Sequence, residues 1–452
     1  MDHDLIIIGG GAGGLGALRA ALWAKADVLM INDGPPGGDC TFTGCVPSKT
    51  LLSAARGGAS FDEAMARVHA TVDRIAATET ADVLVEHGAS FIEDRARLVT
   101  HDSVAVGERR ISAPRIIVAT GGRASAPPIP GLADTPHHTN ETIFSLASQP
   151  TRLGIIGGGA IGCEMAEAFA VLGTEVTLVE GADRLLPREE PAASAIVEAA
   201  LRRRGVEILT GTTIGAVAPS GAEVHLTARE RTIAVDQLLV AVGRTPNTEG
   251  LGLEDLGATL DERGHVETDD RLQTGISGVY AVGDVTGKLP FTHAADEMGR
   301  LAAGNALKKG IRGRYRTHHT PWVTFTSPEV ARVGMTEAEA AATGSARVVE
   351  LPMSEMDRAI TDGREDGFIM LITGPKLVTR HAGGGNVIGA TIVADRAGEM
   401  INEVAFAMRT RAFAGRLAQT VHAYPTWSYG LQKVAAQLFG EVEGRTWRPA
   451  RA

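Results

Sequence analysis

The stretch GGDCTFTGCVPSK, residues 37–49, decides how the rest of this chain is interpreted. It contains Cys40 and Cys45, two of the three cysteines of the protein, at the spacing Cys-x4-Cys on the first turns of a predicted helix. The partial positive charge at a helix N-terminus stabilises a thiolate and lowers the pKa of a thiol. A zinc site needs about four ligands, and no second cysteine pair is present to complete one. The spacing therefore favours redox chemistry over a pair of packed structural cysteines.

A glycine-rich segment precedes the cysteine pair. Residues 5–8 (LIII) form the continuous apolar run of a buried parallel strand, and GGGAGG follows at 9–14. We expect a helix over 17–26 and a second strand over 28–31. This order is a Rossmann half, which places a pyrophosphate on a helix N-terminus.

A second, independent unit of the same kind starts near Thr151. Its predicted strand is 153–156, its turn is GGGAIG at 157–162, its helix is 163–172, and its next strand is 175–179. Two such units in one chain argue for two dinucleotides.

The residue that ends the second strand of each unit bears on which nucleotide binds. In the first unit Asn32, followed by Asp33, holds the place where an acid usually binds the adenosine ribose. An Asn side chain still accepts a hydrogen bond, so we expect weakened rather than lost recognition. In the second unit Glu180 lies where a ribose 2′-hydroxyl is bound, which predicts NADH as the preferred nucleotide. Arg184 is close by and keeps NADPH open as an alternative.

Together these motifs resemble the FAD-dependent pyridine nucleotide-disulfide oxidoreductases, in the branch of dihydrolipoamide dehydrogenase and mercuric reductase. The resemblance covers nearly the whole chain. It implies an α/β fold with two Rossmann-like dinucleotide-binding domains and a C-terminal α+β dimerisation domain. The segments it implies are a first FAD-binding part at 1–150, an NAD(P)-binding domain at 151–248, a central second FAD-binding part at 249–316, and a dimerisation domain at 317–452.

The same resemblance implies roles for individual residues. Cys45 would face the flavin as the charge-transfer thiolate, and Cys40 would be the interchange thiol. Lys49 would approach the flavin N5 edge and pair with Glu164, and Asp284 would bind the ribityl chain. The residues expected to bind the two cofactors, FAD and NADH or NADPH, are Gly9, Gly11, Gly14, Asn32, Asp33, Ala119, Thr120, Gly121, Gly157, Gly159, Gly162, Glu180, Gly243, Arg244, Asp284 and His293. We interpret Cys163, inside the second Rossmann helix, as a small packed hydrophobe.

The C-terminal segment HAYPTWSY, residues 422–429, departs from the family pattern. Tyr424 stands where lipoamide and glutathione reductases have a catalytic His, and Tyr429 stands at the place of its Glu partner. A phenol titrates near pH ~10 and an imidazole near ~6.5, so the usual proton donor is missing. His422, two residues away, is an alternative donor. We expect Tyr424, Trp427 and Tyr429 to make the acceptor entrance aromatic.

Composition and charge exclude several classes of function. Hydrophobic residues make up 44% of the 452 residues and charged residues 22%, which is a globular composition. The net charge of −10 argues against a nucleic-acid partner. No signal peptide and no apolar run of ~18 residues is visible, so we expect no membrane span and a cytoplasmic location.

The function that follows is an NAD(P)H-dependent FAD oxidoreductase. Electrons would pass from the nicotinamide through flavin to the Cys40–Cys45 disulfide, and on to an acceptor that is a quinone, a metal ion or a disulfide. One alternative is a disulfide reductase like dihydrolipoamide dehydrogenase. Another is a flavin- and NADH-binding redox sensor or complex subunit with little turnover. The resemblance also implies a homodimer. Mercuric reductase additionally uses a C-terminal cysteine pair, whereas this chain has no cysteine after Cys163.

Overall fold

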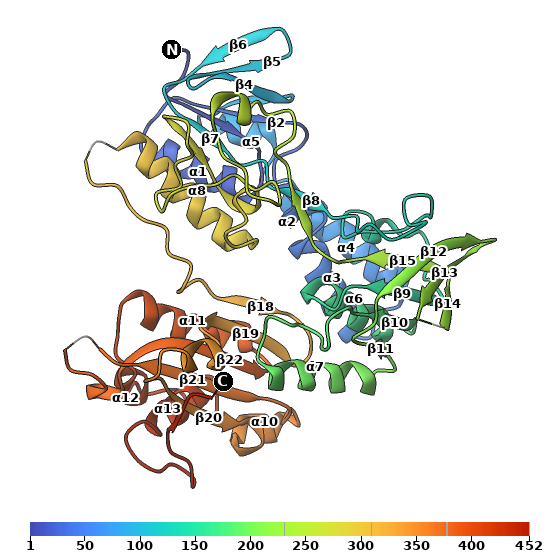
Figure 1. The fold of residues 1–452 in the computed structure, drawn as a ribbon, viewed down its shortest axis with the longest axis vertical. Coiled ribbons are helices and arrows are strands. Elements are labelled where there is room, and N and C mark those ends of the chain that lie inside the picture. Colours follow the sequence, from blue (N-terminus) through green and yellow to red (C-terminus); the bar gives the residue numbers. More distant parts are fainter. Residues whose placement is uncertain (230, 309, 377, 452) are drawn as a thin grey trace. The chain divides into compact units, whose positions relative to one another are not determined.

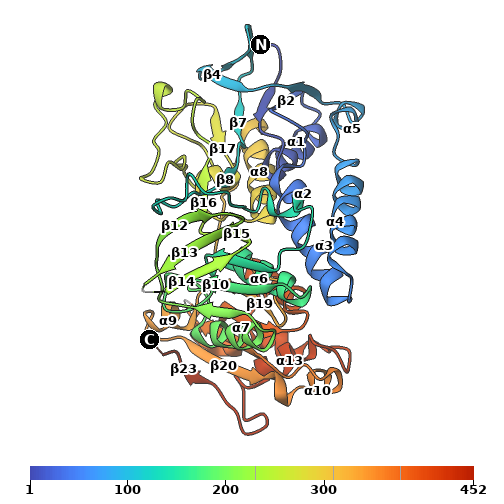
Figure 2. The same ribbon diagram turned by 90° about the vertical axis from the view of Figure 1, so that its right-hand side faces the viewer.

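The computed structural model describes residues 1–229, 231–308, 310–376 and 378–451, and its chain divides into two compact units (Figures 1 and 2). The first unit comprises Met1–Pro128, His137–Gln149 and Leu239–Arg316, and the second comprises Ile129–Pro136, Pro150–Leu238 and Thr317–Ala452. The segments predicted to bind FAD fall mainly in the first unit. Those predicted to bind NAD(P) and to form the dimerisation domain fall mainly in the second, and the four boundaries given above stay predictions.

A five-stranded parallel sheet forms the centre of the first unit. Its order is β17 (Val279–Ala281), β7 (Ile116–Val118), β1 (Leu5–Ile8), β2 (Val28–Asn32) and β3 (Ser90–Glu93). All four residues of β1 are buried, because both faces of the sheet are covered. Leu5 and Ile7 pack with the helices over 12–23 and 292–307, whereas Ile6 and Ile8 pack with the antiparallel strands between residues 96 and 112. The predicted strand over 5–8 is confirmed, and the strand predicted over 28–31 is one residue longer.

Two helices, α1 (Ala12–Trp23) and α8 (Thr292–Leu307), lie side by side in this unit (Figure 1). The prediction that the first helix begins at residue 17 is wrong, because Gly13 and Gly14 of the motif are already helical. Glycines allow α1 and α8 to approach closely: a Cβ on Gly299 of α8 would lie 2.0 Å from the Gly13 carbonyl oxygen. A Cβ on Gly16 would lie 2.7 Å from the backbone oxygen of Asp296 on α8. Packing therefore outweighs the low helix propensity of glycine here.

The remaining elements of the first unit surround this sheet. The helices are α2 (Gly38–Phe42), α3 (Cys45–Arg56), α4 (Phe61–Ala76) and α5 (Ala81–Glu86). The further strands are β4 (Ala96–Thr100), β5 (Ser103–Val106) and β6 (Arg109–Ser112), which form an antiparallel sheet, and the pair β8 (Gly122–Ala124) and β16 (Arg244–Pro246).

The second unit begins with the second Rossmann motif. Its parallel strands are β9 (Arg152–Ile156), β10 (Glu175–Val179) and β11 (Glu207–Leu209), with β15 (Gln237–Val240) next to β9. The helices are α6 (Ala160–Val171) and α7 (Pro191–Arg203), and an antiparallel sheet consists of β12 (Ile214–Ser220), β13 (Glu223–Ala228) and β14 (Arg231–Val235). As in the first unit, the helix starts inside the glycine motif, three residues before the predicted start at 163.

A six-stranded sheet dominates the C-terminal part. Its order is β18 (Trp322–Thr324), β19 (Glu329–Gly334), β22 (Asn386–Ala394), β21 (Phe368–Gly374), β20 (Arg347–Pro352) and β23 (Arg448–Pro449). The helices are α9 (Glu337–Ala341), α10 (Asp357–Asp362), α11 (Ala397–Arg409), α12 (Gly415–Gln419) and α13 (Tyr429–Ala436). Every residue of β21 is buried, which anchors the core of this part. None of the helices in the described part of the chain is long and apolar enough to cross a membrane.

Candidate active site

The cysteine segment is positioned by glycines at both ends. Gly38 has φ +63°, and a Cβ there would lie 2.7 Å from the Cα of Gly11, so the segment starts against the first glycine-rich turn. The expectation of one helix carrying both cysteines is wrong: Cys40 lies in α2, and Cys45 is the first residue of α3. The break is at Gly44, where a Cβ would lie 2.8 Å from the Asp39 carbonyl oxygen. Cys45 therefore stands at the positive end of a 12-residue helix.

The two thiols have different surroundings. The two are not joined in a disulfide; Cys45 is exposed and Cys40 is half-buried. The Cys45 Sγ lies 3.3 Å from the Oγ1 of Thr292, the first residue of α8. The hydrogen bond between the two thiols raises the pKa of Cys40, burial raises it further, and a hydrogen bond to Thr292 opposes both. These contacts favour the protonated form of Cys40, and the expectation that Cys45 is the thiolate stays a prediction.

Lys49 and Glu164 lie on separate elements. Lys49 is four residues after Cys45 on α3, a spacing that puts both on one face of the helix. Glu164 lies on α6, is only 4% exposed, and accepts a hydrogen bond from the Phe325 amide at 2.9 Å. The two residues belong to different units, and their pairing stays a prediction.

The residues at the first glycine-rich turn fit the pyrophosphate and ribose of FAD. Gly9 has φ +108°, and a Cβ on Gly14 would lie 1.9 Å from the Gly9 carbonyl oxygen, so the turn is as tight as a glycine motif allows. Asn32 Oδ1 accepts a hydrogen bond from the Gly10 amide at 2.7 Å, and its Nδ2 donates to the Gly34 carbonyl at 2.8 Å. Asn32 therefore fixes the turn itself. The neighbouring Asp33 forms an exposed ion pair with Arg95 at 3.1 Å.

A second group of residues fits the flavin ribityl chain. Asp284 accepts a hydrogen bond from Arg244 Nε at 2.9 Å, and burial raises the pKa of Asp284 while the arginine opposes that shift. Arg244 also donates to Asp39, the neighbour of Cys40, and to the Gly122 carbonyl. Within the described residues, Asp284 Oδ1 has no hydrogen-bond partner and can accept one from a hydroxyl.

The other predicted residues of this group lie nearby in sequence and space. Ala119, Thr120 and Gly121 follow β7, and Thr120 exchanges hydrogen bonds with Asn247, from Oγ1 to the Asn247 carbonyl at 2.7 Å and from Asn247 Nδ2 to the Thr120 carbonyl at 3.0 Å. Gly243 has φ +149° and leads into β16. His293 is the second residue of α8, next to Thr292, and stacks on Phe291 with ring centroids 5.8 Å apart.

The second glycine-rich turn repeats the geometry of the first. Gly157 has φ +111°, and a Cβ on Gly162 would lie 1.8 Å from the Gly157 carbonyl oxygen. Glu180 occupies the same place as Asn32: its Oε2 accepts from the Gly158 amide at 2.6 Å and its Oε1 from the Ala182 amide at 2.7 Å. Gly159 precedes α6, and a Cβ there would meet open space. Cys163 is fully buried, and burial raises the pKa of its thiol, as expected for a packed residue.

The C-terminal segment presents tyrosines rather than an acid–base pair. The Tyr424 hydroxyl donates to Asp357 Oδ2 at 2.6 Å, and this hydrogen bond raises the pKa of Tyr424. Its ring meets Tyr429 edge to face, with centroids 5.7 Å apart. The expectation that Trp427 adds to an aromatic entrance is wrong, because Trp427 is 9% exposed and packs into the core of this part.

His422 is held inside the same part of the chain. Its Nε2 lies 3.0 Å from both carboxylate oxygens of Glu403, and its Nδ1 lies 2.9 Å from the Thr420 carbonyl. A carboxylate on one imidazole nitrogen is the arrangement of an acid–base pair, so His422 stays the alternative proton donor, although its side chain is only 6% exposed.

Sequence reasoning missed four residues of this site: Asp39, Asn247, Thr292 and Asp357. The first three lie close in sequence to residues that the motifs marked. Asp39 precedes Cys40, Thr292 precedes His293, and Asn247 is three residues after Arg244. Asp357 had no such signal, since it precedes Tyr424 by 67 residues and meets it only through folding.

Comparison with known proteins agrees with this geometry. Residues 3–299 match the family described as pyridine nucleotide-disulphide oxidoreductase, and residues 320–435 match its dimerisation domain. A mercuric reductase from Bacillus cereus is 33% identical, over 97% of this chain and 72% of that protein. A dihydrolipoyl dehydrogenase from Chlamydia muridarum is 31% identical, over 94% of each.

Solved structures are similar over nearly the full length. The Cu(II) complex of the HOCl-induced flavoprotein disulfide reductase RclA from Escherichia coli has a TM-score of 0.87 at 30% identity, covering 96% of this chain and 99% of that one. LpdA from Mycobacterium tuberculosis has a TM-score of 0.85 at 29% identity, covering 96% and 100%. This chain therefore belongs to the pyridine nucleotide-disulphide oxidoreductases, flavoenzymes that use FAD, NAD(P)H and a redox-active cysteine pair.

Proposed function

We propose that this enzyme delivers electrons from NADH, through its cysteine pair, to a thiophilic or readily reduced metal ion rather than to a disulfide. The observation that carries the proposal is that Tyr424, which stands by resemblance at the place of the catalytic His, is hydrogen-bonded to Asp357. Mercuric reductases among the relatives and the Cu(II) complex of the structurally similar RclA support a metal ion as the acceptor.

The cysteine pair has the chemistry for this task. Bound FAD supplies the two-electron chemistry between the nicotinamide and the sulfurs. The reduced pair then consists of a Cys45 thiolate, which Thr292 hydrogen-bonds, and a Cys40 thiol. Oxidation of the pair re-forms the disulfide, releases the Cys40 proton and gives up two electrons. These reduce one divalent ion to the metal, or two Cu²⁺ ions to Cu⁺.

The reduction of a disulfide makes demands that these residues do not meet. Thiol–disulfide exchange needs a thiolate on the attacking sulfur, yet the contact with Cys45 and burial raise the pKa of Cys40. The leaving thiolate then needs a proton, and positioned acid–base groups contribute about 10²–10⁴-fold. Tyr424 is a poor donor near neutral pH because its pKa is raised further by Asp357.

A quinone is the second candidate acceptor. Tyr424 is 64% exposed and forms an aromatic pair with Tyr429, and such a surface suits stacking with a planar ring. A quinone is reduced to a hydroquinone by two electrons and two protons from water or the thiols, so it needs no attack by Cys40 on a sulfur atom.

Three finer features belong to the same proposal. NADH is preferred because Glu180 opposes a 2′-phosphate, while an Arg184 terminal nitrogen already donates to the Pro187 carbonyl at 2.8 Å. The chain works as a homodimer, since it carries the family's dimerisation domain and the Tyr424 segment would serve the site of the partner subunit. A reducing cytoplasm suits a cycling cysteine pair.

A gain-of-function pair tests the proposal. Tyr424→His combined with Tyr429→Glu should raise kcat/KM for lipoamide at least about tenfold, because it supplies the missing acid–base pair. Tyr424→Phe is the matched control and should leave metal-ion reduction within about twofold. A wild-type enzyme that reduces lipoamide faster than every metal ion and quinone, and loses that activity as Tyr424→Phe, would contradict the proposal.

A further inference from the structure

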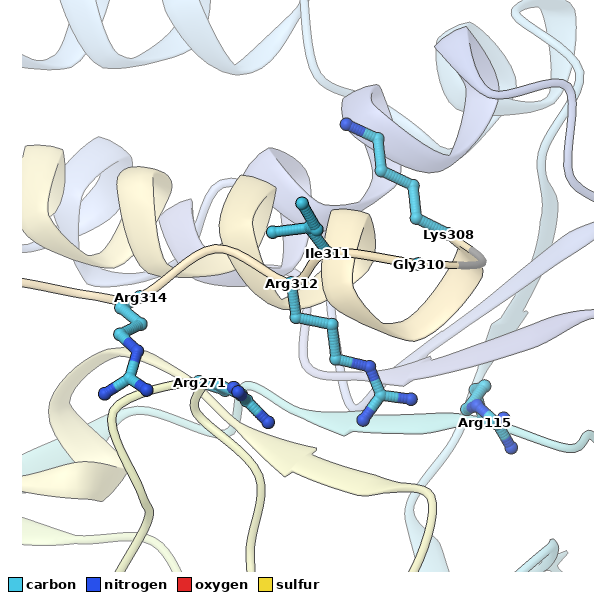
Figure 3. A pocket seen from close by; sticks show the side chains of 7 residues that line it. All are labelled: Arg115, Arg271, Lys308, Gly310, Ile311, Arg312 and Arg314. Carbon is cyan, nitrogen blue, oxygen red and sulfur yellow. The ribbon is translucent and has the colours of Figure 1, made fainter.

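A hollow of about 670 Å³ lies in the first unit, and its lining is almost entirely cationic (Figure 3). The residues that line it are Arg115, Arg271, Lys308, Gly310, Ile311, Arg312 and Arg314. No acidic residue lines it, although the chain as a whole carries a net charge of −10. The Rossmann motifs and the cysteine pair do not account for this concentration of positive charge.

The walls of the hollow are held in place by a buried side chain. Asn305, on the last turns of α8, is 2% exposed. Its Nδ2 donates to the carbonyls of Arg271 and Gly313, both at 3.0 Å, and its Oδ1 accepts from the Gly313 amide at 2.8 Å. The Tyr315 amide also donates to the Asp270 carbonyl at 2.6 Å. The two backbone segments that carry the arginines are therefore fixed to each other.

Most of the cations in the hollow have no counter-charge. Arg314 forms an ion pair with Asp270 at 2.6 Å, whereas the Nε of Arg115 donates to the neutral Ala306 carbonyl at 3.2 Å. Among the described residues, Arg115, Arg271 and Arg312 have no carboxylate within ion-pair distance, and the Arg271 Nε is buried without a hydrogen-bond partner. Arg115 also donates to the Pro114 carbonyl at 2.6 Å, so Arg271 and Arg312 are the guanidinium groups available to an anion, and Arg115 adds positive charge to the lining.

The hollow is separate from the expected FAD site. Arg115 immediately precedes β7, whereas Ala119 follows it, and β7 runs parallel to β1, which leads into the glycine-rich turn. Arg115 and the turn therefore lie at opposite edges of the sheet. The hollow is also at the C-terminal end of α8, whose 16 residues span about 24 Å from Thr292 beside the cysteine pair.

We propose that this hollow, which we call the arginine hollow, binds a soluble oligophosphate anion. A guanidinium matches two phosphate oxygens at once, and a lining with several cations suits a ligand with several adjacent phosphoryl groups. The volume falls within the range of small-molecule pockets. Ile311 at the hollow is 99% exposed, and an exposed apolar side chain among cations would also suit the surface of an anionic membrane. Such a membrane is therefore the competing ligand. The concave shape favours a compact ligand over a flat surface.

Calorimetric titration with inorganic tripolyphosphate tests this site. The protein is the FAD-loaded enzyme with saturating NAD⁺ at low ionic strength, so that both nucleotide sites are filled. We expect one tripolyphosphate per chain, weaker binding of orthophosphate, and loss of affinity as salt is raised. Arg271→Gln and Arg312→Gln should each weaken binding about tenfold, since each removes a charge-assisted contact. Lys25→Gln, an exposed cation elsewhere in the first unit, should change it less than twofold.

Three results would overturn the proposal. The first is the absence of measurable tripolyphosphate binding by a wild-type enzyme with full FAD content. The second is equal weakening by Lys25→Gln and Arg271→Gln, which would indicate only a general charge effect. The third is binding to vesicles containing phosphatidylglycerol without binding of free tripolyphosphate, which would assign the hollow to a membrane surface. A variant counts only if its FAD content and circular dichroism match the wild type.

Discussion

Cys40 and Cys45 differ chemically although only four residues separate them. Cys45 starts α3 and is within 3.3 Å of the Thr292 hydroxyl, while Cys40 is half-buried against Cys45 with a raised pKa. These contacts support the prediction that Cys45 carries the thiolate. The assignment rests on three residues and can be tested at each.

The first prediction concerns the spectrum of the reduced enzyme. After two-electron reduction, we expect a long-wavelength thiolate-to-flavin absorbance that Cys45→Ser abolishes and Cys40→Ser preserves. Thr292→Val should weaken it, because the thiolate loses a hydrogen-bond donor. Anaerobic titration with NADH followed by absorbance measures this. Wild-type spectra in both cysteine variants would show that the pair is only structural.

The second prediction concerns the titration of Tyr424. Its hydrogen bond to Asp357 stabilises the neutral phenol, so its pKa lies above the ordinary value of about 10. The phenol therefore loses its proton at a higher pH than an ordinary tyrosine does, and Asp357→Asn should lower its pKa. Ultraviolet titration of tyrosinate, with Tyr424→Phe as the difference control, detects the change. An unchanged titration in Asp357→Asn would show that the carboxylate has no influence on the phenol.

At the residue scale, motifs in the sequence predict candidate residues but not their contacts. Cys45, Asp284 and Glu180 are candidates because each belongs to a short motif of the family, and their roles stay predictions. Thr292 and Asp357 are not, since a hydroxyl or a carboxylate acquires its role only when a distant segment folds against it.

At the scale of elements, the two glycine-rich turns have the same backbone construction. Each has a glycine with positive φ, at Gly9 and Gly157, and each has a strand-end side chain, Asn32 or Glu180, that accepts from a turn amide. The same construction with different end residues lets one chain hold two dinucleotides. The charge of Glu180 is what distinguishes the second site.

The third prediction follows from that charge. Glu180→Arg should shift the ratio of kcat/KM for NADPH over NADH by at least about 100-fold, because it replaces repulsion of a 2′-phosphate by an ion pair. Steady-state kinetics with both nucleotides measures the shift. Glu180→Gln is the control and should give a smaller change. A wild-type enzyme that prefers NADPH would refute the role of Glu180.

The fourth prediction separates two glycines of the second turn. Gly162→Ala would put a Cβ only 1.8 Å from the Gly157 carbonyl oxygen. This clash should lower the free energy of unfolding by about 1–3 kcal/mol. Gly159→Ala has open space around the Cβ and should keep the stability but raise the KM for NADH, since the backbone there approaches the pyrophosphate. Denaturant titration and kinetics give the two readouts. Equal stability of both variants would contradict this reading of the turn.

The sequence predicted whether a segment is a helix or a strand more reliably than it predicted the residues at which the element begins and ends. The strands over 5–8 and 175–179 are found with the predicted limits, because continuous apolar runs are a strong signal. The two Rossmann helices begin earlier than predicted, because glycine has a low helix propensity and was not expected inside a helix. Glycine is favoured there only where a neighbouring element packs closely, as α8 packs against α1. The sequence gives no direct sign of that neighbour.

At the scale of the whole molecule, the chain combines a dinucleotide-binding region with a dimerisation domain. If the Tyr424 segment serves the site of a partner subunit, activity requires two chains. We expect analytical ultracentrifugation at micromolar concentration to give twice the chain mass. A fully active monomer would contradict this arrangement.

The central claim is that the acceptor is a metal ion rather than a disulfide, and comparison of acceptors under one set of conditions tests it most directly. The measurement is anaerobic NADH oxidation by the wild-type enzyme with Hg²⁺, Cu²⁺, a benzoquinone, lipoamide and glutathione disulfide, reported as kcat/KM. We predict the highest value for a metal ion, and values at least about 100-fold lower for both disulfides, since tyrosines stand at the positions expected for the acid–base pair. A kcat/KM for lipoamide above that for every metal ion would contradict the account.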